Sequence, residues 1–471
     1  MAGARELTCD YLIVGAGATG VSFLEELVTS DPSLTAVIVD CRAAPGGHWN
    51  DAYSFVRLHQ PAVTYGVNSR TLGAGGADLA SKAQILQHYE LAMQDLLATG
   101  RVTYLSQCRY IGSGKVASLV DASLEYQVTF TRKVVDATLT ETKVPATSKP
   151  NFAVAEGVNF VPVNGLSSVA QPWDRYMVVG GGKTGIDAVL FLLDHGLDPA
   201  KICWVIPNDS WLFNRHAFAV EKGIMAEGFA SFVDAVLGAE TGLEALHRLE
   251  AAGHLFRLDQ SIEPTRFRAA TVSKAELVKL AAVRNIVRRG RIARLEADRV
   301  VFQSGEEMLT GPTTLHVDCS TNSTLFYTTE TAKKVWDGDR INLQMIMLPP
   351  PGTSASVIAA LELKFPMDEE KKNSTCSILV PPQMPFDIFS LFRTDGKTQK
   401  TMIPVLGFSF QFARRAFVFK HLRWTEFLKV MYIGKFQSNF SSLIYSIFLG
   451  MMKGDAFQNK LQQFIDENQK S

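Results

Sequence analysis

Short apolar runs and amphipathic segments alternate in the first 40 residues of the chain. The run Tyr11–Val14 is short and apolar, which is typical of a buried strand, and glycines follow it directly. Apolar residues at 21, 24, 27 and 28 then keep helical spacing, and a second apolar run covers 36–39. The order strand, tight loop, helix, strand predicts one βαβ unit of about 30 residues.

The same arrangement occurs a second time further along the chain. An apolar run at 176–179 precedes a glycine cluster, a helical pattern covers 186–193, and another apolar run covers 202–206. One chain therefore holds two copies of the same supersecondary unit, and we predict an internal duplication.

The segments around these two units show weaker patterns. Residues 45–78 predict a long structured loop, and Ser81–Leu97 predicts a helix that Ser81 caps. Polar and apolar positions alternate in three further segments, which predicts three strands that pair in an antiparallel way: 102–109, 116–119 and 126–134. Further along we expect mostly helix over 209–289, including 235–252 and 274–287, and strands at 291–302 and 314–317.

These elements together predict an α/β fold. We expect two Rossmann-like dinucleotide-binding domains, the second inserted in the first, and a mainly helical C-terminal extension. The strand at 314–317 is expected to return to the sheet of the first domain. The predicted boundaries are 1–162 and 290–366 for the first domain, 163–289 for the second, and 367–471 for the extension.

Composition and charge narrow the function classes. Lys plus Arg and Asp plus Glu both total 47 in 471 residues, so no net charge favours binding to nucleic acid. The six cysteines are widely spaced, which argues against a disulfide framework or a zinc module and favours a reducing compartment such as the cytoplasm. No uncharged run reaches the ~18 residues that a transmembrane helix needs.

The first glycine loop has the spacing of a dinucleotide site. Gly15 permits a tight turn, Gly17 lets the backbone approach a diphosphate, and Gly20 lets the helix pack on the strand, with Ala18 and Thr19 between them. Asp40 follows the second strand, where a carboxylate accepts the ribose hydroxyls. Gly46-Gly47-His48-Trp49 comes next and could pass close to a flavin ring, with Trp49 packed on it.

The second glycine loop predicts a nicotinamide-nucleotide site. Its residues are Gly180, Gly182, Lys183, Thr184 and Gly185. Pro207 and Asn208 stand where a carboxylate would favour NADH, which favours NADPH slightly, with Arg215 or Lys183 as a cation for the 2′-phosphate. A duplicated loop kept only for packing is the alternative.

The Gly-Gly-x-Trp pattern of Gly46–Trp49, after the first glycine loop, resembles flavoproteins with two dinucleotide domains: flavin-containing monooxygenases, Baeyer–Villiger enzymes and N-hydroxylases. Three longer stretches more closely resemble a group of FAD/NAD(P)-binding oxidoreductases without a settled substrate. They are Pro45–Trp49, Phe55–Pro61 and Gly182–Asp187, and the resemblance covers about residues 10 to 365. It implies FAD at the first loop, NADPH or NADH at the second, and Asp318 at the ribityl chain or phosphate of FAD. The chain lacks the Phe-x-Gly-x-x-x-His element of flavin-containing monooxygenases, because 160–166 carries no histidine.

The resemblance and the loops predict an FAD-dependent NAD(P)H oxidoreductase, monooxygenase-like, acting on O2 and a small organic substrate. A reductase or dehydrogenase without oxygen insertion and a dinucleotide-binding redox sensor are the alternatives. His59 and Gln60 are the candidate catalytic residues, with His59 as a proton donor, although a lone histidine is more often a buried structural one.

The last hundred residues fit neither βαβ copy. Residues 401–453 hold seven Lys or Arg against the single acid Glu426, among apolar positions with helical spacing. Helices packed on the flavin domain or at a homodimer interface are the favoured interpretation. Peripheral contact with an anionic membrane surface is the alternative.

Overall fold

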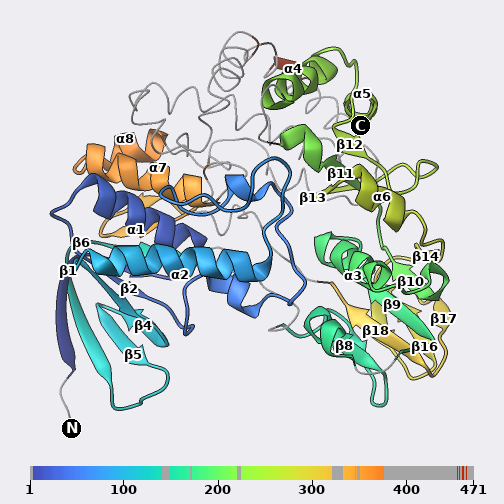
Figure 1. Cartoon of the computed structure of the whole chain (residues 1–471), viewed down its shortest axis with the longest axis horizontal. Helices are drawn as coiled ribbons and strands as arrows, with labels where there is room; N and C mark the ends of the chain where they lie inside the picture. The colour runs from blue at the N-terminus through green and yellow to red at the C-terminus, as the bar shows by residue number, and fades with distance from the viewer. Residues whose placement is uncertain are drawn as a thin grey trace.

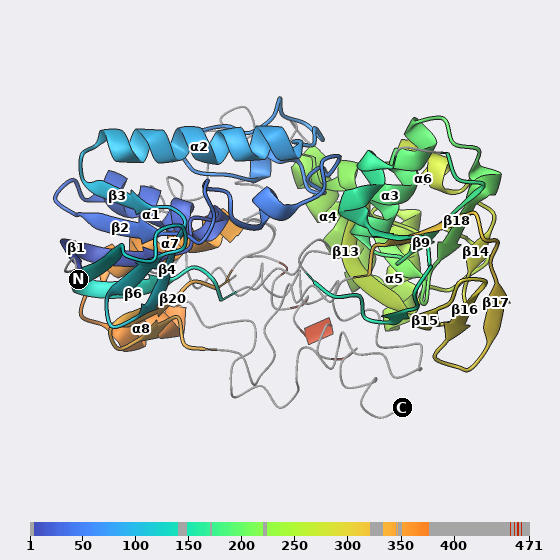
Figure 2. The same cartoon turned by 90° about the horizontal axis from the view of Figure 1, so that it is seen from below.

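The structure, a computed structural model, describes residues 4–139, 148–169, 172–219, 224–320, 333–344, 346 and 351–375, with five single positions beyond residue 452. Two α/β units lie side by side in it, the first drawn in blue with orange helices and the second in green and yellow (Figures 1 and 2). The predicted fold of two dinucleotide-binding domains is confirmed. The C-terminal predictions beyond residue 375 lie outside the described residues, apart from those single positions.

The first unit is built on five parallel strands. Their spatial order is β20(Arg340–Asn342), β6(Glu125–Asp136), β1(Arg5–Val14), β2(Ala36–Val39) and β3(Val102–Leu105). The predicted antiparallel strands are confirmed in part: β4(Cys108–Gly112) pairs antiparallel with β5(Lys115–Ser118), and β5 pairs antiparallel with β6. The expected strand 102–109 is divided between β3, which is parallel to β2, and β4. The strand β19(Trp336–Asp337) pairs antiparallel with β20.

Helices cover this sheet and include the predicted capped one. They are α1(Ala18–Ser30), α2(Lys82–Ala98), α7(Pro351–Lys364) and α8(Glu369–Thr375). Ser81 forms a capping box with Gln84 at the start of α2, as the sequence predicts. Between β2 and α2 the chain forms the predicted long loop, with two short 3₁₀ turns, η1(Gly47–Asp51) and η2(Ala62–Thr64).

The second unit repeats the five-stranded order. Its strands are β8(Phe160–Pro162), β18(Thr314–Asp318), β9(Arg175–Val179), β10(Ile202–Val205) and β14(Ile286–Val287), all parallel. The helix α3(Lys183–Asp194) connects β9 to β10 as α1 connects β1 to β2. The predicted duplication is confirmed for the strand–helix–strand units, but the edge strands differ: β8 comes before β9 in the chain, whereas its counterpart β20 comes after β6.

The expected return of 314–317 to the first sheet is wrong. This segment is β18, which lies between β8 and β9 in the second sheet. All five of its residues are buried, as is usual for an interior strand of a parallel sheet, which is covered on both faces. The chain returns to the first sheet only at β19 and β20. The domain boundaries expected at residues 163 and 290 therefore do not match the strand pairing, because β8 and β18 both belong to the second sheet.

A small sheet extends the second unit. The expected strand 291–302 is a hairpin of β15(Ile292–Leu295) and β16(Arg299–Phe302), paired with β17(Glu307–Leu309) and β7(Ala153–Val154). Its apolar residues pack against β9 and β10 in one cluster. This packing explains why residues 290–310 stay with the second unit.

The segment 209–289 is not mostly helical. It holds the helices α4(Ile224–Leu237), α5(Gly242–Ala251) and α6(Lys274–Leu280), but also the strands β11(Ser210–Asn214), β12(Leu255–Phe256) and β13(Arg266–Val272). The expected helix 235–252 is interrupted because Thr241 caps α5, accepting from the Glu244 backbone N–H at 3.2 Å. The expected helix 274–287 ends at Leu280, and its last residues form β14.

Within the described ranges, no helix is long and apolar enough to cross a membrane, and no three His, Cys, Asp or Glu gather as a metal site. The five cysteines found there form no disulfide.

Candidate functional site

The first glycine loop forms the tight turn that the sequence predicts. Gly15 adopts a φ of +105° and donates its backbone N–H to the Val39 carbonyl at 2.7 Å. A Cβ on Gly20 would lie 1.9 Å from the Gly15 carbonyl oxygen, so only glycine lets α1 pack this close to β1. Gly17 caps α1 without any side-chain hydrogen bond, which leaves the amides of the first turn, from Ala18 and Thr19 on, for a ligand.

Asp40 stands directly after β2, at the edge of the sheet that the glycine loop occupies. Its carboxylate accepts the Ala16 backbone N–H at 2.7 Å and the Arg42 backbone N–H at 2.8 Å. These bonds fix the buried carboxylate beside the loop. Because a carboxylate accepts about four hydrogen bonds, Asp40 keeps capacity for two ribose hydroxyls.

The segment Gly46–Trp49 packs against the first glycine loop. The Gly46 N–H donates to the Ala16 carbonyl at 2.8 Å, and a Cβ on Gly47 would lie 3.0 Å from the Gly17 Cα. Trp49 is buried and donates its indole N–H to the Tyr65 hydroxyl at 2.8 Å. Burial and the charge of Arg42 lower the pKa of the neighbouring His48 to about 4, so His48 is neutral near pH 7.

The first turn of α7 lies beside the first turn of α1. A Cβ on Gly352 would lie 2.7 Å from the Ser22 Oγ and 2.8 Å from the Gly66 carbonyl oxygen. Ser356 also donates to the Ser22 carbonyl at 3.4 Å, and the ends of the two helices line one cavity, so they run parallel. Their positive N-terminal ends therefore point the same way, and the buried Ser22 Oγ has no hydrogen-bond partner among the residues that the structure describes.

The second glycine loop reproduces the first one. Gly180 adopts a φ of +126° and donates to the Val205 carbonyl at 3.0 Å, and a Cβ on Gly185 would lie 1.9 Å from the Gly180 carbonyl oxygen. Gly182 caps α3 without a side-chain hydrogen bond, as Gly17 caps α1. The two loops thus share one geometry, and each is a candidate anion site at the N-terminus of its helix.

The second unit differs from the first at the position of Asp40. The equivalent residue is Ile206, because its backbone N–H donates to Val287 as that of Asp40 donates to Leu105. The sequence had placed Pro207 and Asn208 there. Ile206 packs over Gly181, where a Cβ would lie 2.8 Å from the Ile206 Cγ2. An apolar side chain thus stands in the second unit where the first unit has the Asp40 carboxylate.

Asp318 lies in the second unit and not beside the first glycine loop. It ends β18 and accepts the Ser320 backbone N–H at 2.8 Å and its hydroxyl at 2.6 Å. Burial raises the pKa of this carboxyl, although the Ser320 hydrogen bonds oppose the shift. The next residue, Cys319, places its carbonyl 2.9 Å from where a Gly180 Cβ would be, so Asp318 adjoins the second loop.

His59 lies between the units. Its carbonyl accepts from the Arg215 guanidinium Nε at 3.4 Å and from the Thr271 hydroxyl, both in the second unit. Burial and the charges of Lys183 and Arg215 lower the pKa of His59 to about 3. The imidazole is therefore neutral near pH 7, and its role as a proton donor stays a prediction. Gln60 follows it in the same partly buried loop.

Both cations that the sequence suggests for a 2′-phosphate form ion pairs within the protein. Arg215 pairs with Glu276 at 2.8 Å, and Lys183 pairs with Asp187 one helical turn along α3. Asp187 also accepts from the hydroxyl of Tyr53 at 2.6 Å. Neither Tyr53 nor Asp187 is among the site residues predicted from the sequence, although the spacing of Lys183 and Asp187 by four residues predicts that they share one helix face.

A comparison with family models finds none that matches the chain. Among curated proteins, the Uncharacterized protein Rv2000 of Mycobacterium tuberculosis (strain H37Rv) is 37% identical over 406 residues, covering 83% of this chain and 74% of the relative. The Uncharacterized protein Mb2023 of Mycobacterium bovis gives the same values. The chain belongs to the family of these mycobacterial proteins.

The fold of this Rv2000-family chain is similar to that of a solved structure. The structure of cyclohexanone monooxygenase from Rhodococcus sp. Phi1 bound to NADP+ matches with a TM-score of 0.50 at 13% identity, covering 89% of this chain and 99% of the other. At this identity the match concerns the fold alone. It confirms the predicted resemblance to flavoproteins with two dinucleotide domains at the level of architecture.

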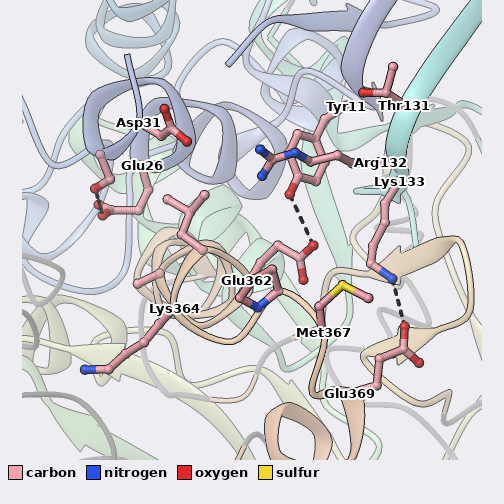
Figure 3. Close-up of a pocket in the computed structure, with 14 residues that line it drawn as sticks. Tyr11, Glu26, Asp31, Thr131, Arg132, Lys133, Glu362, Lys364, Met367 and Glu369 are labelled. Atoms are coloured by element: carbon pink, nitrogen blue, oxygen red, sulfur yellow. Dashed lines mark hydrogen bonds and ion pairs between the residues drawn. The ribbon is translucent and has the colours of Figure 1, made fainter. Parts of the chain in front are cut away.

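A cavity of about 1040 Å³ in this Rv2000-family chain lies away from both loops. Figure 3 shows Tyr11, Arg132 and Glu362 at this cavity, whose lining comes from β1, β6, the C-terminal parts of α1 and α7, and residues 366–369. Tyr11 donates to Glu362 at 3.1 Å. Because dinucleotides bind at the carboxyl ends of parallel strands, this cavity is separate from the candidate sites.

Proposed function

We propose that this chain is a flavin-dependent oxidoreductase that binds FAD at the first glycine loop and NADPH at the second. The observation that carries the proposal is the matched geometry of the two loops, each at the carboxyl edge of its own parallel sheet. A protein that uses a nicotinamide nucleotide alone needs one such loop. Two loops fit a bound flavin and a nucleotide that reduces it.

The residues at the first loop fit FAD. Gly15, Gly17, Ala18, Thr19 and Gly20 would hold the diphosphate on the amides of α1, and Asp40 would bind the adenosine ribose. Gly47, His48 and Trp49 would border the flavin side of the site. Three observations support this assignment: the end of α1 has no side-chain cap, the end of α7 lies beside it, and the Ser22 hydroxyl has no hydrogen-bond partner within the described ranges. When bound, FAD supplies hydride acceptance and electron transfer to a second substrate.

The residues at the second loop fit NADPH. Gly180, Gly182, Lys183, Thr184 and Gly185 would hold the diphosphate on α3, with Asp318 at the neighbouring strand end. Ile206 supports NADPH over NADH, because no carboxylate repels a 2′-phosphate at that position. The Rhodococcus cyclohexanone monooxygenase, whose structure contains NADP+, is consistent with this choice.

For the overall reaction we propose oxygen insertion into a small organic substrate. His59 and Gln60 lie in a loop that contacts both units, which suits groups that act where the two nucleotides meet. A bound diphosphate would offset the charges of Lys183 and Arg215, and the His59 imidazole would then protonate more readily.

A reductase or dehydrogenase without oxygen insertion is the second candidate. The segment 160–166 favours this second candidate. It forms β8 and the start of a 3₁₀ turn, Val163–Ser168, and it has Pro162 and Leu166 at the positions of the glycine and the histidine of flavin-containing monooxygenases. Its Asn164 side chain instead donates to the Asp51 carbonyl at 2.9 Å.

One experiment tests the proposal and separates the two candidates. Purified protein is reconstituted with FAD, its flavin content is measured, and it is reduced with NADPH without oxygen. Oxygen is then added with a panel of ketones, amines and sulfides. One FAD per chain and bleaching by NADPH support the proposal. Incorporation of isotopic oxygen into a product supports the monooxygenase, whereas stoichiometric peroxide with every compound supports the reductase. Protein without flavin uptake overturns both.

A further inference from the structure

One face of α3 is turned toward the first unit. Lys183, Asp187 and Phe191 follow one another at intervals of four residues, which places them in a row on the helix surface. The segment 51–59 of the first unit lies along this row. It starts at the end of η1, next to the first glycine loop, and finishes at His59, next to Lys183.

Asp187 is the centre of the contact. Its Oδ2 accepts from the Tyr53 hydroxyl at 2.6 Å, and both of its oxygens accept from the Lys183 ammonium. The Lys183 and Asp187 side chains are only 16% and 13% exposed, so water screens their interaction weakly. Burial and the Asp187 charge raise the pKa of Tyr53 well above its usual value, so Tyr53 keeps its proton and donates it.

Further contacts hold the same segment on the second unit. The Phe55 ring stacks on Phe191 with centroids 4.1 Å apart, and the Ser54 and Ser167 hydroxyls are hydrogen-bonded at 2.9 Å. These contacts fix the segment in position around Tyr53.

The location of Asp187 is electrostatically unfavourable for a phosphate site. A carboxylate one turn into a helix repels a diphosphate held at the N-terminus of that helix. Lys183 offsets this repulsion, but the same diphosphate would bind more tightly if Lys183 were not engaged by Asp187. Binding of the coenzyme alone therefore does not explain a carboxylate at position 187. A contact that holds the two candidate nucleotide sites together does explain it.

We propose that Asp187 is a positioning residue for hydride transfer: through Tyr53 it holds segment 51–59, and the flavin side of the first unit, in register with the helix that binds NADPH. The inference rests on the proposed function. Hydride transfer needs the donor and acceptor atoms in close, aligned contact, so a loosened segment slows the transfer without emptying either site.

The test compares Tyr53→Phe and Asp187→Asn with the control Tyr11→Phe. Tyr11 also donates a buried hydroxyl hydrogen to a carboxylate, that of Glu362, but in the cavity between β1, β6, α1 and α7, which no residue of segment 51–59 lines. The readouts are FAD content, NADPH affinity by equilibrium titration, the melting temperature, and the rate constant of flavin reduction by NADPH without oxygen.

Both test variants should retain FAD and slow flavin reduction ~10-fold, while Tyr11→Phe reduces at the wild-type rate. Tyr53→Phe should leave NADPH affinity within ~2-fold, and Asp187→Asn should tighten it ~3-fold or more, because Lys183 is released toward the phosphates. The double variant should be no slower than the slower single one, since both changes break the same contact.

Reduction within ~2-fold of wild type in Tyr53→Phe overturns the inference and leaves the proposed function intact. Tyr53→Phe removes one hydroxyl only and keeps the test decisive if Asp187→Asn fails to fold. A slow variant whose NADPH affinity falls in proportion also overturns the inference, because it indicates a binding role. Wild-type protein that takes up no FAD overturns the proposed function, and this inference with it.

Discussion

A side-chain carbon on Gly20 would lie 1.9 Å from the carbonyl oxygen of Gly15, and the same distance separates a carbon on Gly185 from the oxygen of Gly180. Neither helix can accept a methyl group there without moving away from its strand. We therefore expect Gly20→Ala to abolish FAD retention and Gly185→Ala to abolish NADPH binding, with ~1–3 kcal/mol lost in each free energy of unfolding. Flavin content and chemical unfolding measure both.

Gly311→Ala is the matched control for these two variants. A Cβ at Gly311 would meet only the Thr314 Oγ1, at 3.8 Å, and this glycine does not have a positive φ. Its stability should change by less than ~0.5 kcal/mol. Gly20→Ala protein with full flavin content and unchanged stability would contradict the packing described for α1.

Coenzyme preference should depend on Ile206. In Ile206→Asp the new carboxylate can accept the Gly181 backbone N–H, as Asp40 accepts that of Ala16 at 2.7 Å. It would then bind ribose hydroxyls and repel a 2′-phosphate, so the preference for NADPH over NADH should fall ~10-fold or more. Competition by 2′,5′-ADP and by AMP measures the change without turnover. Unchanged affinity for both would show that the adenosine ribose lies elsewhere.

Acid should destabilise the protein through buried histidines. His254 bonds the Ser231 hydroxyl through Nε2 at 3.1 Å, and burial lowers the pKa of its imidazole from 6.5 to about 4. Between these values the unfolded chain binds a proton that the native protein does not, so stability rises with pH across this window and falls as the pH drops. Each such histidine contributes a slope of up to ~1.4 kcal/mol per pH unit.

His254→Gln should reduce that slope by about the contribution of one proton. Urea unfolding at several pH values between about 4 and about 6.5 measures it. His48 and His59, whose pKa values burial also lowers, act in the same direction and remain in the variant. An identical slope in His254→Gln would mean that His254 is protonated in the native protein.

A buried ion pair joins α7 and α8. Lys372 is fully buried and bonds Glu362 at 2.5 Å, and Glu362 also accepts from the Trp336 indole at 2.8 Å. Lys372→Met leaves the buried carboxylate without its counter-ion and should cost ~3–5 kcal/mol of unfolding free energy. Adding Glu362→Gln should restore part of this loss. If Lys372→Met lowers the free energy of unfolding by less than ~1 kcal/mol, water reaches the Lys372–Glu362 pair in the native protein.

The sequence pattern correctly predicted the tight turns and helix caps, because these depend on a few adjacent residues. The turns at Gly15 and Gly180 and the cap at Ser81 each depend on a few adjacent residues, and the structure contains all three. Asp40 was found for the same reason, because it directly follows a strand whose pattern is clear. The fold class followed from these units.

Long-range pairing was not predictable from the same patterns. The run 314–317 reads as a buried strand in either sheet, and only its contacts with Tyr176–Val179 and Phe160–Pro162 place it in the second. The strand β13 pairs with β11, more than 50 residues earlier, and its sequence lacks clear alternation.

The most informative contact was also the least visible in the sequence. The Tyr53–Asp187 hydrogen bond joins residues 134 positions apart. Helical spacing marks Lys183 and Asp187 as neighbours, but nothing local indicates that a loop from the first unit would lie over them. Such contacts between units follow from how the two sheets are arranged.

The most direct test of two matched dinucleotide sites is anaerobic reduction of the FAD-reconstituted protein by NADPH, followed in the flavin absorbance of wild type, Gly17→Val and Gly182→Val. The account predicts one FAD per wild-type chain and bleaching by NADPH, no flavin in Gly17→Val, and in Gly182→Val a full flavin content that NADPH no longer bleaches. Equal flavin content and equal bleaching in all three proteins would contradict it.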